Sequence, residues 1–293
     1  MTNNQPERNP VGEDIIPAKT TDIGVELKLA SNASMYINTG NSQDQGARSY
    51  QEDSFGYSNL IDSRIVSSKG VFAVLADGMG GLSNGKAVSD FVVQSAIAQF
   101  EAIDPHASIS EQLIRIAYSI NGQISKKYVV DGSSKAGSTF VCAYIFKNRI
   151  YWLTIGDSRL YCYRRGHLLQ MNEDHDYKNQ LLRDYIDSGE NADISALKGI
   201  EANAQKDSLV SFIGKNGVPG VDVSLIGYRI LPQDTFVLCS DGIYNGITQN
   251  NMKEILRASD AQTSSDQIVA SVLKARLPGQ DNMTVMVIKC DKH

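Results

Sequence analysis

Cysteine, histidine and tryptophan are scarce in this chain. Its 293 residues include four cysteines, four histidines and one tryptophan. No C-x-x-C pair occurs, and the cysteines stand far apart in apolar segments, so we expect reduced, buried thiols rather than a disulfide framework. A zinc site is disfavoured because His and Cys form no cluster. The thiols concerned are Cys142, Cys162, Cys239 and Cys290.

An excess of positive charge and long apolar runs are also missing. Lys and Arg number 28 against 33 Asp and Glu, which gives a formal net charge of −5. The densest basic cluster is Arg164-Arg165, too short to follow a phosphate backbone, so we expect no nucleic-acid partner. No apolar run approaches the roughly 20 residues that cross a membrane. The polar N-terminus lacks the apolar segment of a signal peptide. These absences predict a cytoplasmic protein without a membrane partner.

The chain does contain a long succession of strand-like and helix-like segments. Apolar stripes with helical spacing predict helices from about residue 83, at 110–128, 250–258 and 264–276. The strands between 138 and 171 follow one another closely and are predicted to form one antiparallel meander. Strand runs with two helix pairs interposed predict an α+β fold layered around one core. The predicted strands are 25–30, 34–38, 71–76, 138–146, 149–156, 159–165, 167–171, 221–230, 234–241 and 283–290.

Two segments stand apart from this pattern. Residues 1–23 are polar and carry three prolines, so they are predicted to form a flexible tail that precedes a folded domain at 24–293. Residues 172–208 are polar with one weak helical stripe. They are predicted to form an insertion that lies over the core.

Four acidic residues stand at the ends of apolar, strand-like runs that are far apart in the chain. Asp77 ends VFAVLAD, Asp157 follows IYWLTIG, Asp241 ends DTFVLCSD and Asp281 opens DNMTVMVI. Each acid alone could belong to an ordinary turn or helix cap. Four such strand ends together predict one carboxylate cluster, and clustered like charges need a counter-charge. Oxygen ligands favour a hard divalent cation, so the pattern predicts a Mg²⁺ or Mn²⁺ site.

A short polar segment, RSYQED, places Arg48, Glu52 and Asp53 within six residues. Such a segment on its own is usually a solvated loop. Beside the four acids it gains meaning, because an arginine fork matches phosphate oxygens bidentately and Glu52 offers a further oxygen ligand. The carbonyl of Gly78, directly after Asp77, is another hard ligand.

The order of these motifs resembles that of a known family, the metal-dependent protein phosphatases, or type 2C serine/threonine phosphatases, and in particular its bacterial members. The resemblance runs from about residue 31 to 290, through RSYQED, VFAVLADGMGG, GSTF, IYWLTIGDSRLYCYRRGHL, EDH, DTFVLCSDGIYNGI and DNMTVMVI. It implies an α-β-β-α sandwich of two mostly antiparallel sheets flanked by helix pairs, with metals at one end. It also implies a mobile flap at about 176–210, near the metal site.

The resemblance assigns metal ligands residue by residue. Asp77 would bridge two cations, Asp241 and Asp281 would bind the first of them, and Glu52 with the Gly78 carbonyl would serve the second.

The same resemblance gives roles to four more residues and exposes one departure from the family pattern. Asp53 would orient metal-bound waters, Asp157 with Asp241 would hold a weaker third cation, and Arg48 would grip the substrate phosphate. Met79 stands where some members carry a histidine that acts as a general acid. His175, in the EDH motif, would be structural and would anchor the entry to the insertion.

The implied activity is hydrolysis of phosphoserine and phosphothreonine in proteins by water that two cations, roughly 4 Å apart, activate together. No phosphoenzyme is needed, in agreement with the lack of a C-x5-R loop. The expected partners are phosphorylated substrates of a cognate serine/threonine kinase pathway, and the expected state is a monomer. Two alternatives remain open: a pseudophosphatase that binds phosphoproteins as a scaffold, and a partner-switching phosphatase of a small regulator.

Overall fold

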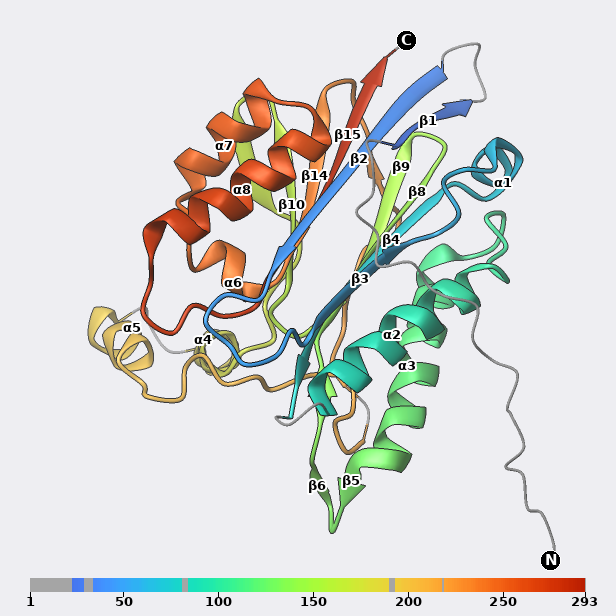
Figure 1. Ribbon diagram of the computed structural model, residues 1–293. Helices are drawn as coiled ribbons and strands as arrows, with labels where there is room; N and C mark the ends of the chain where they lie inside the picture. The colour runs from blue at the N-terminus through green and yellow to red at the C-terminus, as the bar shows by residue number, and fades with distance from the viewer. Residues whose placement is uncertain (1–22, 29–33, 81–83, 190–192, 218, 293) are drawn as a thin grey trace, which may run out of the picture.

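Two β-sheets pack face to face and helices cover their outer faces (Figure 1). The computed structural model describes residues 23–28, 34–80, 84–189, 193–217 and 219–292. The predicted tail therefore lies outside the described residues, apart from Ile23. The first sheet has the order β1-β2-β15-β14-β10-β11, and its printed pairings are antiparallel. Its strands are β1 (Ile23–Lys28), β2 (Ser34–Asp44), β15 (Met283–Lys292), β14 (Asp234–Cys239), β10 (Arg159–Arg164) and β11 (His167–Gln170).

The second sheet has the order β12-β9-β8-β4-β3 and is also antiparallel. Two short strands join it at the side: β13 pairs with β9, and β7 pairs with β4. A separate hairpin of β5 (Val129–Val130) and β6 (Ser133–Ser134) follows the second long helix. The strands of the second sheet are β3 (Asp53–Tyr57), β4 (Val71–Met79), β7 (Gly137–Ser138), β8 (Phe140–Phe146), β9 (Arg149–Ile155), β12 (Asp222–Val223) and β13 (Tyr228–Arg229).

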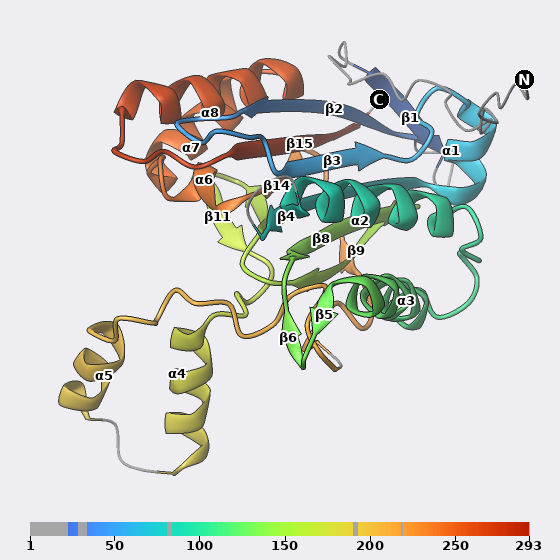
Figure 2. The same cartoon turned by 60° about the horizontal axis from the view of Figure 1, so that its bottom comes forward.

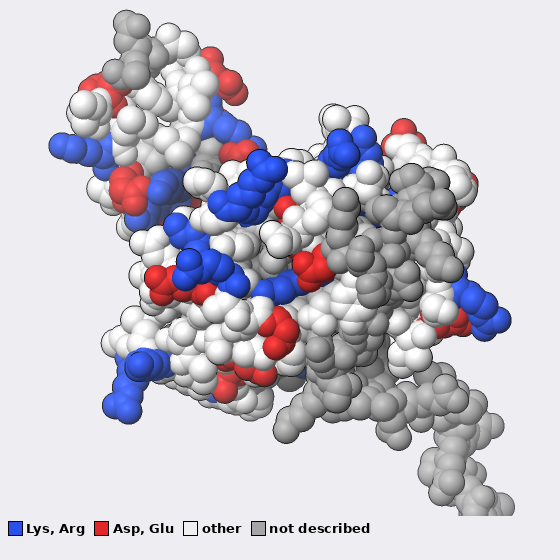
Figure 3. Space-filling model, turned by 90° about the horizontal axis from the view of Figure 1, so that it is seen from above, with Lys and Arg blue, Asp and Glu red and all other residues white. Residues whose placement is uncertain are grey.

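Each sheet carries one pair of long helices on its outer face, as Figure 1 shows. α2 (Asn84–Phe100) and α3 (Ile109–Tyr128) pack on the second sheet, and α7 (Gln249–Ala258) and α8 (Ala261–Ala275) pack on the first. The predicted α-β-β-α sandwich is thus confirmed. The shorter helices are α1 (Ser63–Lys69), α4 (Tyr177–Asp187), α5 (Ile194–Glu201) and α6 (Asp241–Tyr244). Among the described residues, no helix combines the length and the apolar character needed to cross a membrane. On the face of the molecule shown in Figure 3, Lys and Arg side chains are interspersed with Asp and Glu.

Strand β4 shows why its sequence is apolar throughout. Alternate side chains of a strand point to opposite faces of the sheet. Phe72 and Val74 contact the helix layer, where Phe72 stacks on Phe100 with ring centroids 4.7 Å apart. Val71 and Leu75 point the other way, into the core between the sheets. Both faces of β4 are therefore buried, and its continuous apolar run ends only at Asp77.

The predicted meander between residues 138 and 171 is wrong as a single unit. β8 and β9 form one hairpin and β10 and β11 form another, as the turns at 147–148 and 165–166 predict. However, β9 belongs to the second sheet, whereas β10 pairs with β14 in the first. The chain changes sheet at Gly156, whose φ is +101°. Sequence periodicity marks each strand but carries no information about this change of partner.

The insertion also differs from its prediction. Its helices α4 and α5 have no buried residues, and they stand away from the body of the sandwich (Figure 2). The two legs of the segment run together at its base, where Tyr177 N–H donates to the Ser208 carbonyl and Val210 N–H donates to the His175 carbonyl, both at 2.9 Å. The insertion therefore projects from a narrow stem rather than lying over the core.

Candidate active site

The sequence-predicted residues meet at the end of the sandwich where α6 lies (Figure 1). Asp77 ends the apolar run of β4, Asp241 begins α6 two residues after the end of β14, and Asp281 stands two residues before β15. Asp157 lies at the change of sheet after β9, and Glu52 directly precedes β3. A cavity of about 300 Å³ is lined by Arg48, Glu52, Asp77, Gly78, Met79, Gly80, Thr139, Asp157, Leu209, Asp241, Asp281 and Asn282.

Asp53 lies behind this cavity and does not line it. Its side chain is fully buried, and one carboxylate oxygen accepts hydrogen bonds from Ser240 Oγ at 2.8 Å and Thr284 Oγ1 at 2.7 Å. The register of β3 and β4 places it directly opposite Asp77. Burial raises the pKa of Asp53 to about 6, although these two hydrogen bonds oppose the rise. Asp53 thus holds negative charge behind the cavity without facing it.

The acids that line the cavity are held in a setting that disfavours their charged forms. Burial, followed by the charge of Asp53, raises the pKa of Asp77 well above its ordinary value. Burial and then Asp241 raise the pKa of Asp157 to about 7, and burial and then Asp281 raise the pKa of Asp241 to about 6. Each of these shifts reflects desolvation together with a neighbouring like charge. A cation in the cavity would relieve both.

Two oxygens of the cavity residues lack any hydrogen-bond partner among the described residues although they are buried. They are Glu52 Oε1 and Asp241 Oδ1, and Asp53 Oδ1 behind the cavity is a third. A buried polar oxygen without a partner is costly, so such atoms call for a ligand. The donors are carboxylate and carbonyl oxygens, the set that hard divalent cations prefer. The residues present therefore fit Mg²⁺ or Mn²⁺.

All four acids that the sequence places at strand ends line this one cavity. Within the part of the chain that the structure describes, no group of three or more His, Cys, Asp and Glu residues has the ready-made arrangement of a metal site. The cavity therefore gathers the predicted acids, and their role as metal ligands stays a prediction.

Arg48 sits at the rim of the cavity. Its guanidinium Nη2 lies 2.5 Å from Asp281 Oδ2, and the side chain remains 57% exposed. The hydrogen bond and charge of Asp281 raise the pKa of Arg48, so the guanidinium is always charged. An arginine that is both exposed and anchored at one nitrogen can present its remaining N–H groups to an anion that enters the cavity.

Backbone packing is very tight where Glu52 meets the start of α2. A Cβ added to Gly78 would lie 2.2 Å from the carbonyl oxygen of Gly85, and one added to Gly85 would lie 2.3 Å from Glu52 Oε1. A side chain at Gly78 would clash with backbone, so only glycine fits there, whereas one at Gly85 would displace the Glu52 carboxylate. Gly78 was predicted from its motif, whereas the role of Gly85 was missed because NGK gives no strong signal before a helix.

Thr139, Leu209 and Asn282 also line the cavity and were not singled out as site residues. Thr139 Oγ1 accepts a hydrogen bond from Asp77 N–H at 2.9 Å and so fixes the end of β4. Leu209 comes from the stem of the insertion. The GSTF and DNMT motifs contain Thr139 and Asn282, so these two could have been proposed from sequence. Nothing in the sequence around Leu209 marks it.

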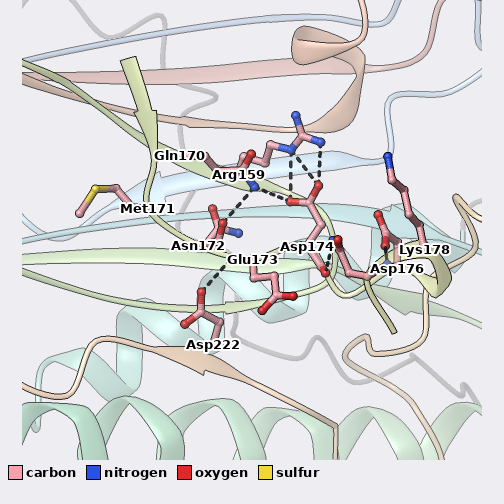
Figure 4. Close-up of a pocket in the computed structure, with 10 residues that line it drawn as sticks. Arg159, Gln170, Met171, Asn172, Glu173, Asp174, Asp176, Lys178 and Asp222 are labelled. Atoms are coloured by element: carbon pink, nitrogen blue, oxygen red, sulfur yellow. Dashed lines mark hydrogen bonds and ion pairs between the residues drawn. The ribbon is translucent and has the colours of Figure 1, made fainter. Parts of the chain in front are cut away.

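A second hollow, of about 500 Å³, lies at the base of α4 (Figure 4). Arg159 points into it and makes an ion pair with the buried Asp174 at 2.7 Å, as the dashed lines show. The guanidinium also lies over the ring of Tyr244, with its Cζ 3.5 Å from the ring centre. The ion-pair partner of Arg159 is therefore Asp174, which follows it by 15 residues in the chain.

His175 stands between this hollow and the change of sheet. It is 6% exposed, its backbone N–H donates to the Gly156 carbonyl at 2.9 Å, and its Nδ1 lies 3.2 Å from Gly156 N. Burial lowers the pKa of His175 and so keeps the ring neutral. These contacts agree with the structural role implied for it at the entry to the insertion.

Comparison with known proteins identifies the family. A family model for protein phosphatase 2C matches residues 48–278, well over half of the chain, and ends just before Asp281. The serine/threonine phosphatase stp of Listeria monocytogenes is 27% identical over 250 residues, which cover 83% of this chain and 92% of that protein. The serine/threonine protein phosphatase PstP of Mycobacterium tuberculosis is 26% identical over 214 residues, which cover 73% of this chain and 39% of that protein.

Solved structures support the same fold. A serine/threonine phosphatase of S. agalactiae superposes with a TM-score of 0.72 at 21% identity, over 86% of this chain and 99% of that one. The catalytic domain of PstP in complex with two manganese ions superposes with a TM-score of 0.66 at 23% identity, over 88% and 99%. On the evidence of the sequence match and the shared sandwich, the chain belongs to the protein phosphatase 2C family, the metal-dependent serine/threonine phosphatases, and resembles its bacterial members.

Proposed function

We propose that this chain hydrolyses phosphoserine and phosphothreonine esters in proteins with two Mg²⁺ or Mn²⁺ ions held at the 300 Å³ cavity. The observation that carries the proposal is that seven residues singled out from the sequence line one cavity. Two of them leave a buried carboxylate oxygen without a hydrogen-bond partner among the described residues. Those seven residues are Arg48, Glu52, Asp77, Gly78, Asp157, Asp241 and Asp281.

The carboxylates divide the work of holding the cations. Asp77 lines the cavity near the end of β4, and we assign it as the ligand that both ions would share. Asp241 and Asp281 would hold one ion, and Glu52 with the carbonyl of Gly78 would hold the other. When bound, such ions supply a nucleophilic water at neutral pH and neutralise phosphate charge.

Other residues of the chain orient the substrate and the ligands. Arg48, exposed at the rim, would bind the phosphoryl oxygens of the substrate and offset the charge that develops on them. Asp53 accepts hydrogen bonds from Ser240 and Thr284 and holds its carboxylate behind the proposed site of the two cations. Asp157 and Asp241 both line the cavity, the charge of Asp241 contributes to the raised pKa of Asp157, and together they would hold a third, weaker cation.

The natural substrates are proposed to be phosphoproteins of a serine/threonine kinase pathway.

Met79, which lines the cavity, has no proton to donate, so it cannot protonate the leaving serine or threonine oxygen.

The test is phosphate release from a phosphothreonine peptide with Mn²⁺, compared with Asp241→Ala and with chelator-treated protein. We expect turnover in the wild type alone, and calorimetric titration should show two tight Mn²⁺ sites. Absence of turnover with Mn²⁺ bound would indicate a phosphoprotein-binding scaffold. Absence of both turnover and Mn²⁺ binding would refute the proposal as a whole.

A further inference from the structure

Asn282 makes an unusual set of contacts beside the cavity. It directly follows Asp281 and is 5% exposed. Its Oδ1 accepts a hydrogen bond from Glu52 N–H at 2.7 Å, and its Nδ2 donates to the carbonyls of Gln45 and Tyr50, both at 2.9 Å. The orientation of the amide follows from these partners, because an N–H must face an oxygen and the carbonyls must face the NH₂ group.

The three partners of Asn282 all lie in one connecting segment, residues 45–52 between β2 and β3, which we call the arginine loop because it carries Arg48. One buried side chain thus fastens the start, the middle and the end of this loop to the residue before β15. Both the oxygen and the nitrogen of the Asn282 amide make hydrogen bonds to the loop, so no neutral side chain of another shape can make the same three hydrogen bonds.

The arginine loop also packs closely against residues 280–281, which precede Asn282. Ala47 N–H donates to the Gln280 carbonyl at 2.8 Å. Gly46 adopts a φ of +63°, and a Cβ placed on it would lie 2.3 Å from the Asp281 carbonyl oxygen. The arginine loop therefore rests directly on the backbone that presents Asp281, and Asn282 holds it there.

This placement matters because two proposed functional groups belong to the loop and a third belongs to its support. Arg48 extends from the loop to the rim, Glu52 ends the loop at the cavity wall, and Asp281 adjoins Asn282. The Arg48 side chain is long and more than half exposed, so its position depends on the backbone that carries it. A displacement of about 1 Å at such a group can cost about 100-fold in rate.

We propose that Asn282 is a positioning residue that sets where Arg48 and Glu52 stand relative to Asp281, and through them the binding of the substrate phosphate. This inference rests on the proposed phosphatase function. It adds a residue that touches neither the phosphate nor a cation but fixes the three groups that do.

The first test compares Asn282→Ala with a matched control, Gln112→Ala. Gln112 accepts from Asp104 N–H at 2.9 Å and donates to the carbonyls of Asp104 and Ser108 at 2.8 and 3.3 Å. It thus makes the same pattern of three hydrogen bonds at the start of α3. At saturating Mn²⁺, we expect Asn282→Ala to raise the KM for a phosphothreonine peptide about tenfold or more. Gln112→Ala should leave KM unchanged, within about twofold.

A double-mutant cycle separates positioning from a general loss of stability. At saturating Mn²⁺, where the contribution of Glu52 to metal binding no longer limits KM, Asn282→Ala introduced into Arg48→Ala protein should change KM by less than about twofold. Multiplying effects would overturn the proposal. Asn282→Asp keeps the acceptor for Glu52 N–H but loses both donors, so it should raise KM as alanine does. If alanine does not fold, this variant carries the same test.

Manganese titration gives a readout that does not depend on turnover. Because Asn282 holds Glu52 N–H, Asn282→Ala should weaken Mn²⁺ binding several-fold, whereas Gln112→Ala should not. A wild type without turnover would remove the proposed function and this inference with it. A wild type that turns over normally, beside an Asn282→Ala protein with unchanged KM and Mn²⁺ affinity, would overturn the inference alone.

Discussion

Arg48→Ala is the change that separates phosphate binding from metal binding most sharply. The substitution removes a guanidinium that lies 2.5 Å from Asp281, in an ion pair whose side chains are 57% and 34% exposed. Exposed pairs of this kind contribute at most about 1 kcal/mol to stability. We therefore expect the variant to fold, with a Tm lowered by no more than about 4 °C.

The kinetic effect should be much larger than the effect on stability. A hydrogen bond to a charged group contributes about 1.5–3 kcal/mol. Loss of the arginine contact with a phosphate dianion should therefore lower kcat/KM by about 10- to 150-fold, mainly through KM. Mn²⁺ affinity should be retained or rise by at most about fivefold, because Asp281 no longer has to leave an ion pair when it binds a cation.

The assay is steady-state hydrolysis of a phosphothreonine peptide at saturating Mn²⁺, with a calorimetric Mn²⁺ titration of the same protein. Arg64→Ala serves as the control, since Arg64 also pairs with an aspartate, Asp62, but lies on α1, outside the cavity lining. Its kinetic constants should match those of the wild type. Weaker Mn²⁺ binding in Arg48→Ala, or an unchanged KM, would show that Arg48 does not have the role assigned to it.

Three further predictions concern charge and burial. Asp241→Asn should abolish Mn²⁺-dependent turnover. Burial raises the pKa of Asp241 to about 6, so folding disfavours its ionised form, and the metal-free wild type loses stability as the pH rises from about 4 to about 6. The Asp241→Asn protein should therefore have a higher Tm than the wild type at pH 7 but not at pH 4. Arg164→Ala removes the guanidinium that lies 2.6 Å from the carboxylate of Asp234, whose side chain is 1% exposed. The substitution should lower the free energy of unfolding, measured by chemical denaturation, by about 3–5 kcal/mol and leave KM unchanged. The four cysteines are buried, so a thiol reagent should label none of them until the protein unfolds, and rapid labelling of native protein would contradict this.

The sequence located the site because the acids stand next to strand ends, and strand ends are visible as breaks in apolar runs. Asp77 illustrates this, since the run before it is apolar on both faces of β4. Asp241 and Asp281 flank β14 and β15, which are neighbours in the first sheet. The order of motifs then identified the family. The roles of these acids as metal ligands remain predictions, which the Mn²⁺ titrations described above would test.

Shorter or less regular features were beyond the reach of sequence patterns. β3 has five residues and follows a polar segment, so RSYQEDSF reads as a loop although Asp53 begins a strand. α1 has seven residues, of which only Val66 is buried, so it lacks an apolar stripe. The contacts of Asn282 join residues about 230 positions apart, and nothing in the local sequence announces them.

The error about the meander bears directly on the site. Had β9 and β10 formed one hairpin, Asp157 would have stood at a turn on the edge of a single sheet, in contact with solvent. Because the chain instead changes sheet at Gly156, Asp157 stands between the ends of both sheets, where it lines the cavity that Asp241 reaches from the first sheet. Burial and the charge of Asp241 together raise the pKa of Asp157 to about 7, which no solvated hairpin turn would produce. The same crossing that periodicity could not predict is therefore what turns the GDSR aspartate into part of the site.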